Sequence, residues 1–247
     1  MRNILTSIKK CISTSIRGKK SWKGSQKYEF KAAREFMETP FFSDLMIRNK
    51  KLRDEQSNTL DMGLLFSDFF QNDQMKVDNF VGNMTGKNCL EVGPCCSTVL
   101  ANWWFIKNRY IIEPLLSKIK EYQTARFGYT LFDETINYAC PAEILITELI
   151  GKIDGAIICR NCIDHTPNWP FVLNNMVSYM APGATLLIWN DIYHLDGVDE
   201  GHYDITDNIE NYKSLLSNLG LIIGYEFSYD VNKRRALNYG CIAQKAS

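Results

Sequence analysis

The segment from Gly86 to Leu116 constrains the fold of this chain more than any other part of the sequence. Cys89, Leu90 and Val92 form a short apolar run, interrupted near its end by Glu91, of the length that a strand buried in a parallel sheet requires. Gly93 and Pro94 follow at once and break the chain direction. Arg109 to Ile112 is a second apolar run. The segment therefore predicts two parallel strands joined by a tight turn and a connecting helix.

The turn and the end of the second strand together indicate a nucleotide-binding site. Ser97 or Thr98 can cap the connecting helix, and Gly93 before it lets the bare backbone come close to a ligand. Glu113 closes the second strand about 20 residues after the turn. A carboxylate at that spacing can accept hydrogen bonds from both hydroxyls of a ribose.

Two stretches of the sequence resemble class I S-adenosylmethionine-dependent methyltransferases. The first is LEVGP with the acidic residue that ends the next strand, and the second is DGAIICRNCIDHTPNWPFVLNNMVSYMAPGATLLIWND. The resemblance covers roughly residues 80 to 245. It implies an α/β fold with a doubly wound sheet, mostly parallel with an antiparallel C-terminal strand. Helices would lie on both faces, preceded by an N-terminal helical extension.

The resemblance also implies a cofactor, S-adenosylmethionine, and the residues that would bind it. The methionine portion would lie in the turn, the ribose against the acidic strand end, and the adenine against the loop after the third strand. These positions correspond in this sequence to Glu91, Gly93, Pro94, Cys95, Glu113, Pro114, Ala142 and Glu143. Arg160 and Asn161 are added as cofactor-binding candidates because they follow the predicted fourth strand, at the edge of the sheet where active sites form.

The remaining pattern predicts the other strands and helices. Tyr129 to Phe132 is expected to be the third strand, so that Glu143 lies in the loop after it. Glu143 has a second interpretation, in which it only opens a helix from Ile144 to Ile150. Asp207 is expected to cap a helix from Ile209 to Leu219. The segments Leu221–Phe227 and Tyr239–Ala243 should pair as antiparallel strands.

Two histidines are candidates for the catalytic base, because many methyl acceptors must lose a proton and imidazole titrates near neutral pH. His165 follows the predicted fourth strand, and His202 lies in an acidic loop beside Glu200 and Asp204. Three alternatives to these histidines stay open: another residue is the base, the proton is lost directly to solvent, or the nucleophile needs no base. The loop more readily predicts a lid over the substrate than a metal site, because no recognised ligand spacing supports a metal.

Three functions remain open on these observations. The first is methyl transfer from S-adenosylmethionine to a small molecule or a sugar-bearing precursor. The second is a non-catalytic domain, because Cys95 stands where the family pattern has a second glycine and its side chain could crowd the cofactor. The third is a nicotinamide-dependent Rossmann enzyme, whose fingerprint needs a third glycine where Val99 and Leu100 stand.

The composition limits the partners and the compartment. Cysteines fall inside apparent core strands, which is typical of a reducing cytosol and predicts a cytoplasmic protein. No run of 18 apolar residues occurs, so no membrane-spanning segment is expected. Residues 1–28 hold eight Lys and Arg and no Asp or Glu, which leaves 20 basic and 28 acidic residues in the rest. This main part lacks the basic surface of a nucleic-acid-binding protein, so no nucleic-acid partner is expected.

The N-terminal region divides into two expected parts. Residues 1–27 predict a basic tail or an amphipathic helix, because isoleucines recur every four residues among lysines and arginines. In the second case residues 1–20 would contact a membrane surface. Residues 28–82 predict a helical cap, and residues 83–247 the Rossmann-like domain.

Overall fold

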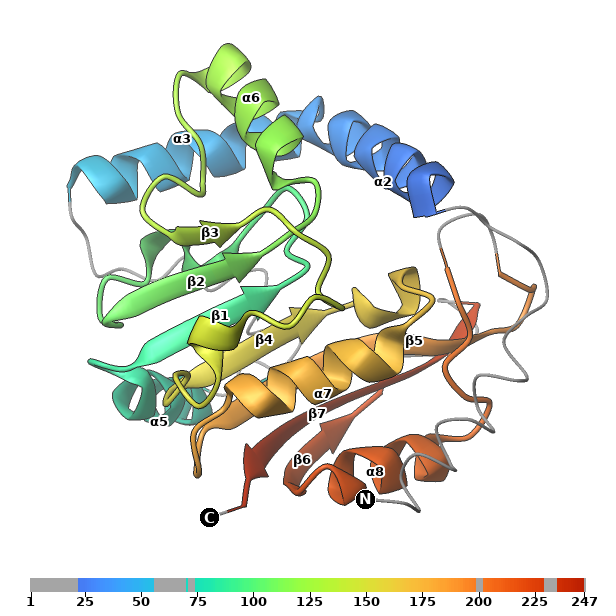
Figure 1. Ribbon diagram of the computed structural model, residues 1–247. Coiled ribbons are helices and arrows are strands. Elements are labelled where there is room, and N and C mark those ends of the chain that lie inside the picture. Colours follow the sequence, from blue (N-terminus) through green and yellow to red (C-terminus); the bar gives the residue numbers. More distant parts are fainter. Residues whose placement is uncertain (1–21, 56–69, 71–73, 199–201, 229–234, 247) are drawn as a thin grey trace.

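The described residues of the computed structural model form a seven-stranded sheet in the order β3-β2-β1-β4-β5-β7-β6 (Figure 1). The structure describes residues 22–55, 70, 74–198, 202–228 and 235–246. The strands are β1 (Asn88–Val92), β2 (Asn108–Ile112), β3 (Ile136–Tyr138), β4 (Ala156–Arg160), β5 (Thr185–His194), β6 (Leu221–Phe227) and β7 (Ala236–Lys245). β1 to β5 pair in parallel, and β7 lies antiparallel between β5 and β6. The mostly parallel sheet with an antiparallel C-terminal strand is therefore confirmed.

The register of the central strands brings the predicted site residues to one edge of the sheet. Val92 of β1 pairs with Ile112 of β2 and with Cys159 of β4, so the three strands end at the same level. The chain runs outward from β1 in one direction to β2 and β3, and in the other direction to β4 and β5. Ligands of open α/β sheets bind at such a reversal, outside the carboxyl ends of the strands.

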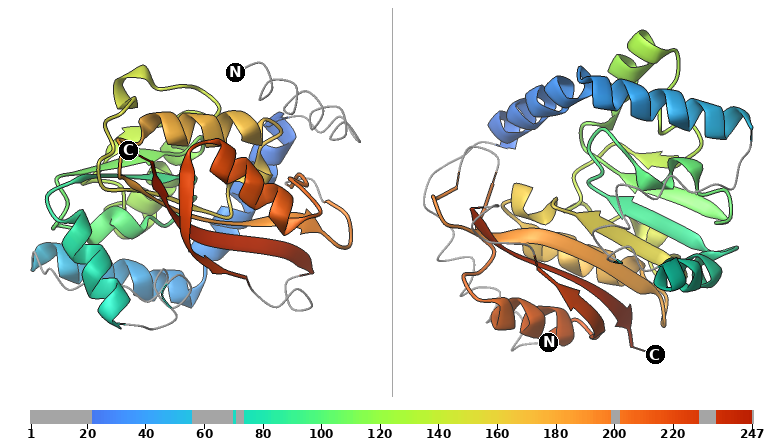
Figure 2. Two further views of the ribbon diagram at one scale, coloured as in Figure 1. Left: turned by 90° about the horizontal axis from the view of Figure 1, so that it is seen from below. Right: turned by 180° about the vertical axis from the view of Figure 1, so that it is seen from behind.

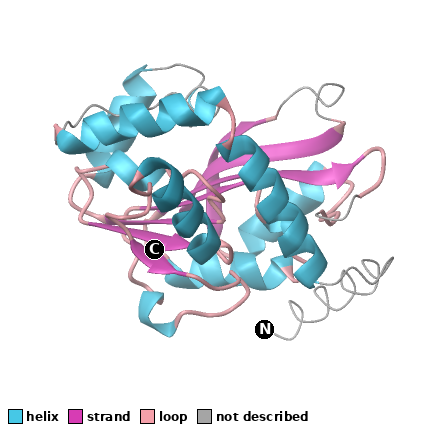
Figure 3. Cartoon of the chain, turned by 90° about the horizontal axis from the view of Figure 1, so that it is seen from above, coloured by secondary structure: helices cyan, strands magenta, loops and turns pink. Residues whose placement is uncertain are grey.

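Helices cover both faces of the sheet, which Figure 3 shows as strands enclosed between helices. They are α2 (Trp22–Met37), α3 (Pro40–Asp54), α5 (Gln74–Met84), α6 (Leu116–Phe127), α7 (Trp169–Tyr179) and α8 (Ile209–Asn218). Alternate strand residues enter different cores, so Cys89 packs with α3, α5 and α6 whereas Leu90 packs with α7 and α8. Figure 2 shows α3 and α5 on the side of the sheet opposite α7. The sheet is thus buried on both faces, as a parallel sheet requires.

The first two described helices, α2 and α3, are joined by a short connection that ends at a proline. Pro40 is the first residue of α3, where its missing N–H costs nothing, and the Thr39 side chain caps this helix by accepting a hydrogen bond from the Phe42 amide. Helix α2 begins at Trp22, so it spans the boundary between the predicted segments 1–27 and 28–82. The division of the chain into three parts stays a prediction.

The helix predicted after Thr98 is wrong. Thr98 does cap an element there, but the element is the four-residue 3₁₀ helix η1 (Val99–Asn102). Its C-cap residue is Trp103, whose buried side chain packs beside Phe80 of α5 and Phe105, with ring centroids 5.9 and 5.5 Å away. Tertiary packing of an aromatic side chain thus overrides the helical pattern.

The third strand lies later in the chain than the sequence predicts. Backbone N–H groups of residues 130–132 donate to side chains instead of a neighbouring strand: Thr130 to Asp133, and Leu131 to Gln123. The segment Tyr129–Phe132 is therefore a turn, and β3 begins at Ile136.

Two further details of the helices differ from the predictions. Instead of a helix from Ile144 to Ile150 the chain forms the short 3₁₀ helix η2 (Thr147–Leu149). The cap of α8 is Asn208 and not Asp207, because the Asn208 carboxamide accepts hydrogen bonds from the first amides of the helix. The antiparallel pairing of β6 with β7 is confirmed.

Some predictions fall on residues outside the described ranges. These are the membrane contact of residues 1–20 and the place of Glu200 beside His202. Among the helices of the described ranges, none combines the length and the apolar character that crossing a membrane demands.

Candidate functional site

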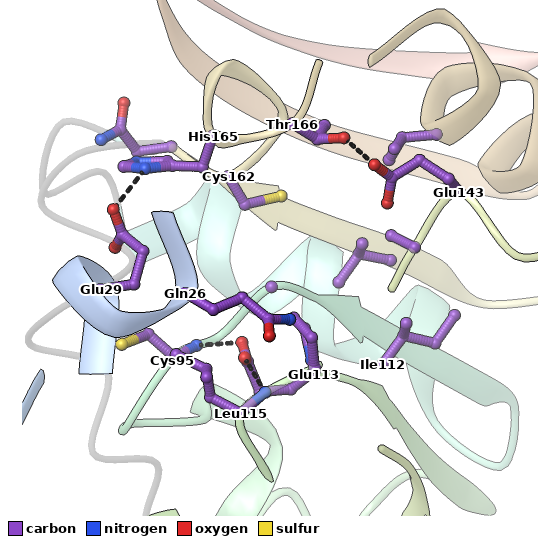
Figure 4. Close-up of a pocket in the computed structure, with 16 residues that line it drawn as sticks. Gln26, Glu29, Cys95, Ile112, Glu113, Leu115, Glu143, Cys162, His165 and Thr166 are labelled. Atoms are coloured by element: carbon purple, nitrogen blue, oxygen red, sulfur yellow. Dashed lines mark hydrogen bonds and ion pairs between the residues drawn. The ribbon is translucent and has the colours of Figure 1, made fainter. Parts of the chain in front are cut away.

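A pocket lies at the carboxyl ends of β1, β2 and β4, where the direction of strand order reverses, and we call it the switch-point pocket (Figure 4). Its cavity volume is about 120 Å³. The lining residues are Gln26, Glu29, Val92, Gly93, Cys95, Ile112, Glu113, Pro114, Leu115, Ala142, Glu143, Asn161, Cys162, His165, Thr166 and Val172. Eight of the twelve residues that the sequence predicts for the site are among them: Gly93, Cys95, Glu113, Pro114, Ala142, Glu143, Asn161 and His165.

The turn after β1 needs glycine at its first position. Gly93 has a φ of 64°, in the left-handed region, and a Cβ there would lie 2.4 Å from the Cβ of Cys162. Cys95, two residues later, is also left-handed, with a φ of 54°. The backbone therefore holds the shape of a glycine turn although a cysteine stands where the family pattern has glycine, and that conformation carries strain. Pro94 between them is buried and does not line the pocket.

Glu113 is fixed by main-chain hydrogen bonds at the end of β2. One carboxylate oxygen accepts from the Cys95 amide at 3.0 Å and the other from the Leu115 amide at 2.8 Å. Its side chain thus ties the turn after β1 to the end of β2 (Figure 4). Burial raises the pKa of Glu113 to about 7, although the two amide donors act to lower it.

Glu91 and Arg160 lie outside the switch-point pocket. Glu91 is buried, and its carboxylate pairs with the Arg160 guanidinium at 3.1 Å and accepts hydrogen bonds from Thr98 and the Val99 amide. These contacts join β1, β4 and η1 beneath the turn. In this structure the two residues support the turn instead of lining the ligand cavity.

The loop after β3 supplies the far wall of the pocket. Ala142 and Glu143 line it, and the Glu143 carboxylate accepts a hydrogen bond from the Thr166 hydroxyl (Figure 4). The alternative interpretation of Glu143, as the first residue of a helix from Ile144 to Ile150, is wrong because that helix does not form. The contact of Glu143 with an adenine ring stays a prediction.

Helix α2 supplies two lining residues that the sequence did not single out, Gln26 and Glu29. Glu29 faces His165 across the pocket, with 2.9 Å between its carboxylate oxygen and Nδ1 of the imidazole (Figure 4). The partners are 136 positions apart in the chain. No local pattern signals such a pair, because it forms only when α2 lies over the carboxyl edge of the sheet.

The lining has a strongly one-sided charge. Its acidic side chains are those of Glu29, Glu113 and Glu143, of which Glu113 is only partly ionised near pH 7, whereas no Lys or Arg is among the described residues that line the pocket. A ligand that enters the pocket therefore meets a negative field, which favours cationic groups and disfavours phosphates.

All three histidines of the chain meet beside this pocket, around the side chain of Asp164, and we call Asp164, His165, His194 and His202 the histidine cluster. The ring centroid of His202 lies 4.3 Å from that of His165 and 5.0 Å from that of His194. The structure thus brings the two predicted base candidates together, although only His165 lines the pocket. Burial raises the pKa of Asp164, whereas the neighbouring His165 and His202 act to lower it.

Comparison with known proteins identifies the fold. No protein-family model matches the sequence, and no curated protein sequence matches it. Similar solved structures exist, however. The 1,6-didemethyltoxoflavin-N1-methyltransferase of Burkholderia thailandensis, with bound S-adenosylhomocysteine, is 13% identical, with a TM-score of 0.50 over 85% of this chain and 91% of that one.

Two further structures give the same fold. Phosphoethanolamine N-methyltransferase 2 of Haemonchus contortus, in complex with S-adenosylmethionine, is 11% identical, with a TM-score of 0.52 over 72% of this chain and 53% of that one. The [4+2]-cyclase SpnF is 12% identical, with a TM-score of 0.50 over 72% of this chain and 83% of that one. The chain therefore has the class I methyltransferase fold, and the resemblance seen in the sequence is confirmed at the level of fold.

Proposed function

We propose that this protein binds S-adenosylmethionine in the switch-point pocket and transfers its methyl group to a small-molecule acceptor. The observation that carries the proposal is the acidic character of the lining, which has three Glu side chains and no Lys or Arg among the described lining residues. S-adenosylmethionine carries a sulfonium and an ammonium group, which such a field attracts.

The residues present fit this cofactor. Glu113 has two backbone donors that fix its orientation, and each carboxylate oxygen keeps a further lone pair for a ribose hydroxyl. The turn at Gly93 and Cys95 would hold the methionine portion, and Ala142 with Glu143 the adenine. The close packing of Gly93 against Cys162 leaves no room for a side chain, so the turn presents bare backbone to the ligand.

When bound, the cofactor would supply a methyl group on a positively charged sulfur. The protein would orient the acceptor, exclude water and hold or remove a proton. Gln26 and Glu29 of α2 cover the pocket, whose volume of about 120 Å³ lies below the range of about 300–1,000 Å³ that is usual for ligand sites. We therefore expect α2 to move outward when the cofactor enters, and its return would seal the site.

The acceptor is proposed to be a small molecule or a sugar-bearing precursor. The cover formed by α2 leaves space for a compact group and not for a folded macromolecule, and the excess of acidic over basic residues beyond residue 28 disfavours a nucleic acid. His165 and His202 stay the candidates for the catalytic base.

Titration calorimetry with S-adenosylhomocysteine tests the proposal. The native protein should bind it, and Glu113→Ala should weaken binding by at least about 100-fold, which is roughly 2.7 kcal/mol. Glu121→Ala, on the exposed face of α6, is the matched control and should leave the affinity unchanged. No binding at millimolar ligand by the folded protein would favour the non-catalytic domain. Mass spectrometry of the purified protein adds an independent search for a retained ligand.

The nicotinamide alternative is less well supported. A dinucleotide needs its pyrophosphate at the N-terminus of a helix after the turn. Here the turn leads into η1, a 3₁₀ helix of four residues, and the carboxylates of the pocket would repel phosphate. Titration with NADH beside S-adenosylhomocysteine separates the two proposals directly.

A further inference from the structure

The Asp164 side chain is a buried carboxylate whose role the contacts described above do not explain. It is fully buried, and neither carboxylate oxygen has a hydrogen-bond partner among the described residues. An isolated buried carboxylate is expensive, so such groups are normally paired, hydrogen-bonded or bound to a metal.

Imidazole side chains of three histidines lie near this carboxylate. Nε2 of His165 lies 3.9 Å and Nε2 of His194 lies 4.0 Å from Oδ2 of Asp164. Asp164, His165 and His202 each offer one atom that could bind a metal, and these three atoms lie within 4.8 Å of one another. The two separations to His165 and His194 are too long for hydrogen bonds, which span about 2.7–3.2 Å. They are close to the spacing of ligand atoms that share one metal ion, about 3.4 Å for bonds of about 2.1 Å in tetrahedral geometry.

Two further carboxylates orient the histidines from outside the cluster. Glu29 contacts Nδ1 of His165 at 2.9 Å, and Asp204 contacts Nδ1 of His194 at 3.1 Å. In both cases the contact uses Nδ1 and leaves Nε2 on the side of Asp164. Metal-binding histidines characteristically donate their second ring N–H to a carboxylate, which fixes the tautomer and the ring orientation.

We propose that Asp164, His165 and His202 bind a divalent transition-metal ion of the zinc or iron(II) type, with His194 beside them as the fourth ligand. Imidazole nitrogens favour these ions, whereas Mg²⁺ and Ca²⁺ prefer oxygen ligands. This site reverses the expectation drawn from the sequence, in which the spacing of these residues predicted no metal. Asp164 and His165 are adjacent in the chain, but His194 and His202 reach them only through the path of β5 and the loop after it.

The ion would lie at the edge of the switch-point pocket, since His165 lines that pocket. Four protein ligands fill a tetrahedral ion, so an oxygen atom of the acceptor would enter as a fifth ligand from the pocket side, and the pKa of its hydroxyl would fall. With the ion bound, His165 and His202 would act as its ligands and not as the catalytic base. This role for the ion rests on the proposed function, whereas the existence of the metal site does not.

Metal titration tests the site directly. Protein stripped with a chelator should bind one Zn²⁺ per chain, and His202→Ala and Asp164→Asn should each weaken binding by at least about 100-fold. Asp196→Ala is the matched control, since Asp196 is an exposed carboxylate that pairs with Arg235, and it should bind Zn²⁺ as the native protein does. If Asp164→Asn does not fold, His202→Gln keeps the test available because His202 lies on a partly exposed loop.

Titration with Co²⁺ identifies the ligands. The neighbouring thiols of Cys159 and Cys162 lie 2.8 Å apart and are the alternative binding site in this region. Nitrogen and oxygen ligands give only weak visible bands, whereas thiolate ligands add intense near-ultraviolet absorption. Intense absorption, or Zn²⁺ binding that survives His202→Ala in a folded protein, overturns the proposal, as does the absence of binding. Parallel titration with S-adenosylhomocysteine separates these outcomes, since loss of cofactor binding contradicts the proposed function and not the metal site.

Discussion

The two ends of the site are built in different ways. At the end proposed to bind the cofactor, which we call the cofactor end, Glu113 is held by the backbone amides of Cys95 and Leu115, so its place follows from the register of β1 and β2. At the end proposed to bind the acceptor, which we call the acceptor end, the histidine cluster is held by contacts between side chains from α2, the segment after β4, and β5 with its following loop. Backbone contacts of neighbouring strands can be predicted from a short sequence motif, whereas the cluster exists only once distant elements are packed together.

Because the two ends are held differently, we expect different kinds of substitution to damage each of them. The cofactor end should be sensitive to changes of backbone conformation, because its donors are amides. The acceptor end should be sensitive to the identity of individual side chains and tolerant of small backbone changes.

The largest effect is expected for Gly93→Ala at the cofactor end. The added Cβ would lie 2.4 Å from Cys162 in a left-handed backbone, so we expect a loss of about 2–4 kcal/mol in the free energy of unfolding and at least about 100-fold in affinity for S-adenosylhomocysteine. Gly128→Ala is the control, because Gly128 is also left-handed but nothing lies within 4 Å of the added atom. It should cost about 1 kcal/mol and leave the affinity unchanged. Equal effects of the two variants in urea unfolding and calorimetry would contradict the close packing described here.

A second prediction concerns the pH dependence that Glu113 imposes on stability. Its pKa is about 7 in the folded protein against an ordinary value of 4.5, so between these values the folded chain keeps a proton that the unfolded chain has lost. This contribution makes the free energy of unfolding fall by about 3 kcal/mol as the pH rises from about 4.5 to about 7. Glu113→Gln should remove it.

Urea unfolding of the native protein and of Glu113→Gln at pH 5 and pH 8 measures this difference. The variant should gain stability relative to the native protein on going to pH 8. The same pH dependence in both proteins would show that the carboxyl group of Glu113 is not the buried acid responsible.

At the acceptor end, Glu29→Gln should act on metal binding more than on stability. Glu29 and His165 are partly exposed, so the pair should contribute at most about 1 kcal/mol to folding. Loss of an outer carboxylate typically weakens metal affinity by about 10–100-fold, and we expect a decrease in Zn²⁺ affinity of this size. Glu35→Gln on the same helix is the control and should bind Zn²⁺ normally. A change in melting temperature with unchanged Zn²⁺ affinity would restrict Glu29 to a structural role.

The smallest effect is expected for Cys95→Gly, which tests how well the cofactor end tolerates its cysteine. Glycine would release about 1 kcal/mol of left-handed strain, and the greater freedom of the unfolded chain would offset a similar amount. Because the Cys95 amide that binds Glu113 is kept, the affinity for S-adenosylhomocysteine should stay within about tenfold. A larger gain in calorimetry would show that the native side chain obstructs the turn.

The parts of the fold that the sequence predicted are those determined by local pattern. Cys89–Val92 and Arg109–Ile112 are strands because apolar runs of that length are buried on both faces, and Glu113 ends β2 as its spacing from Gly93 required. The third strand could not be located, because the amides of Thr130 and Leu131 are taken up by side chains whose position depends on the folded structure.

The candidate site shows the same limit. Eight predicted residues line the switch-point pocket, but Glu91 and Arg160 pair with each other outside it, a contact between β1 and β4 that no local pattern signals. Glu29 could not be predicted, since its partner is 136 positions away. The place of His194 beside Asp164 could not be predicted either, because it depends on β5 continuing to this residue.

The long separation of Glu29 from His165 also sets the order in which the site can be completed during synthesis. At about 5–20 residues per second, His165 leaves the ribosome about 7–27 s after Glu29. Until β4 and the segment after it have been made, the Glu29 carboxylate therefore has no imidazole to contact. The contact that joins α2 to the histidine cluster can form only after that, and it can do so on a pocket that a ligand has already entered.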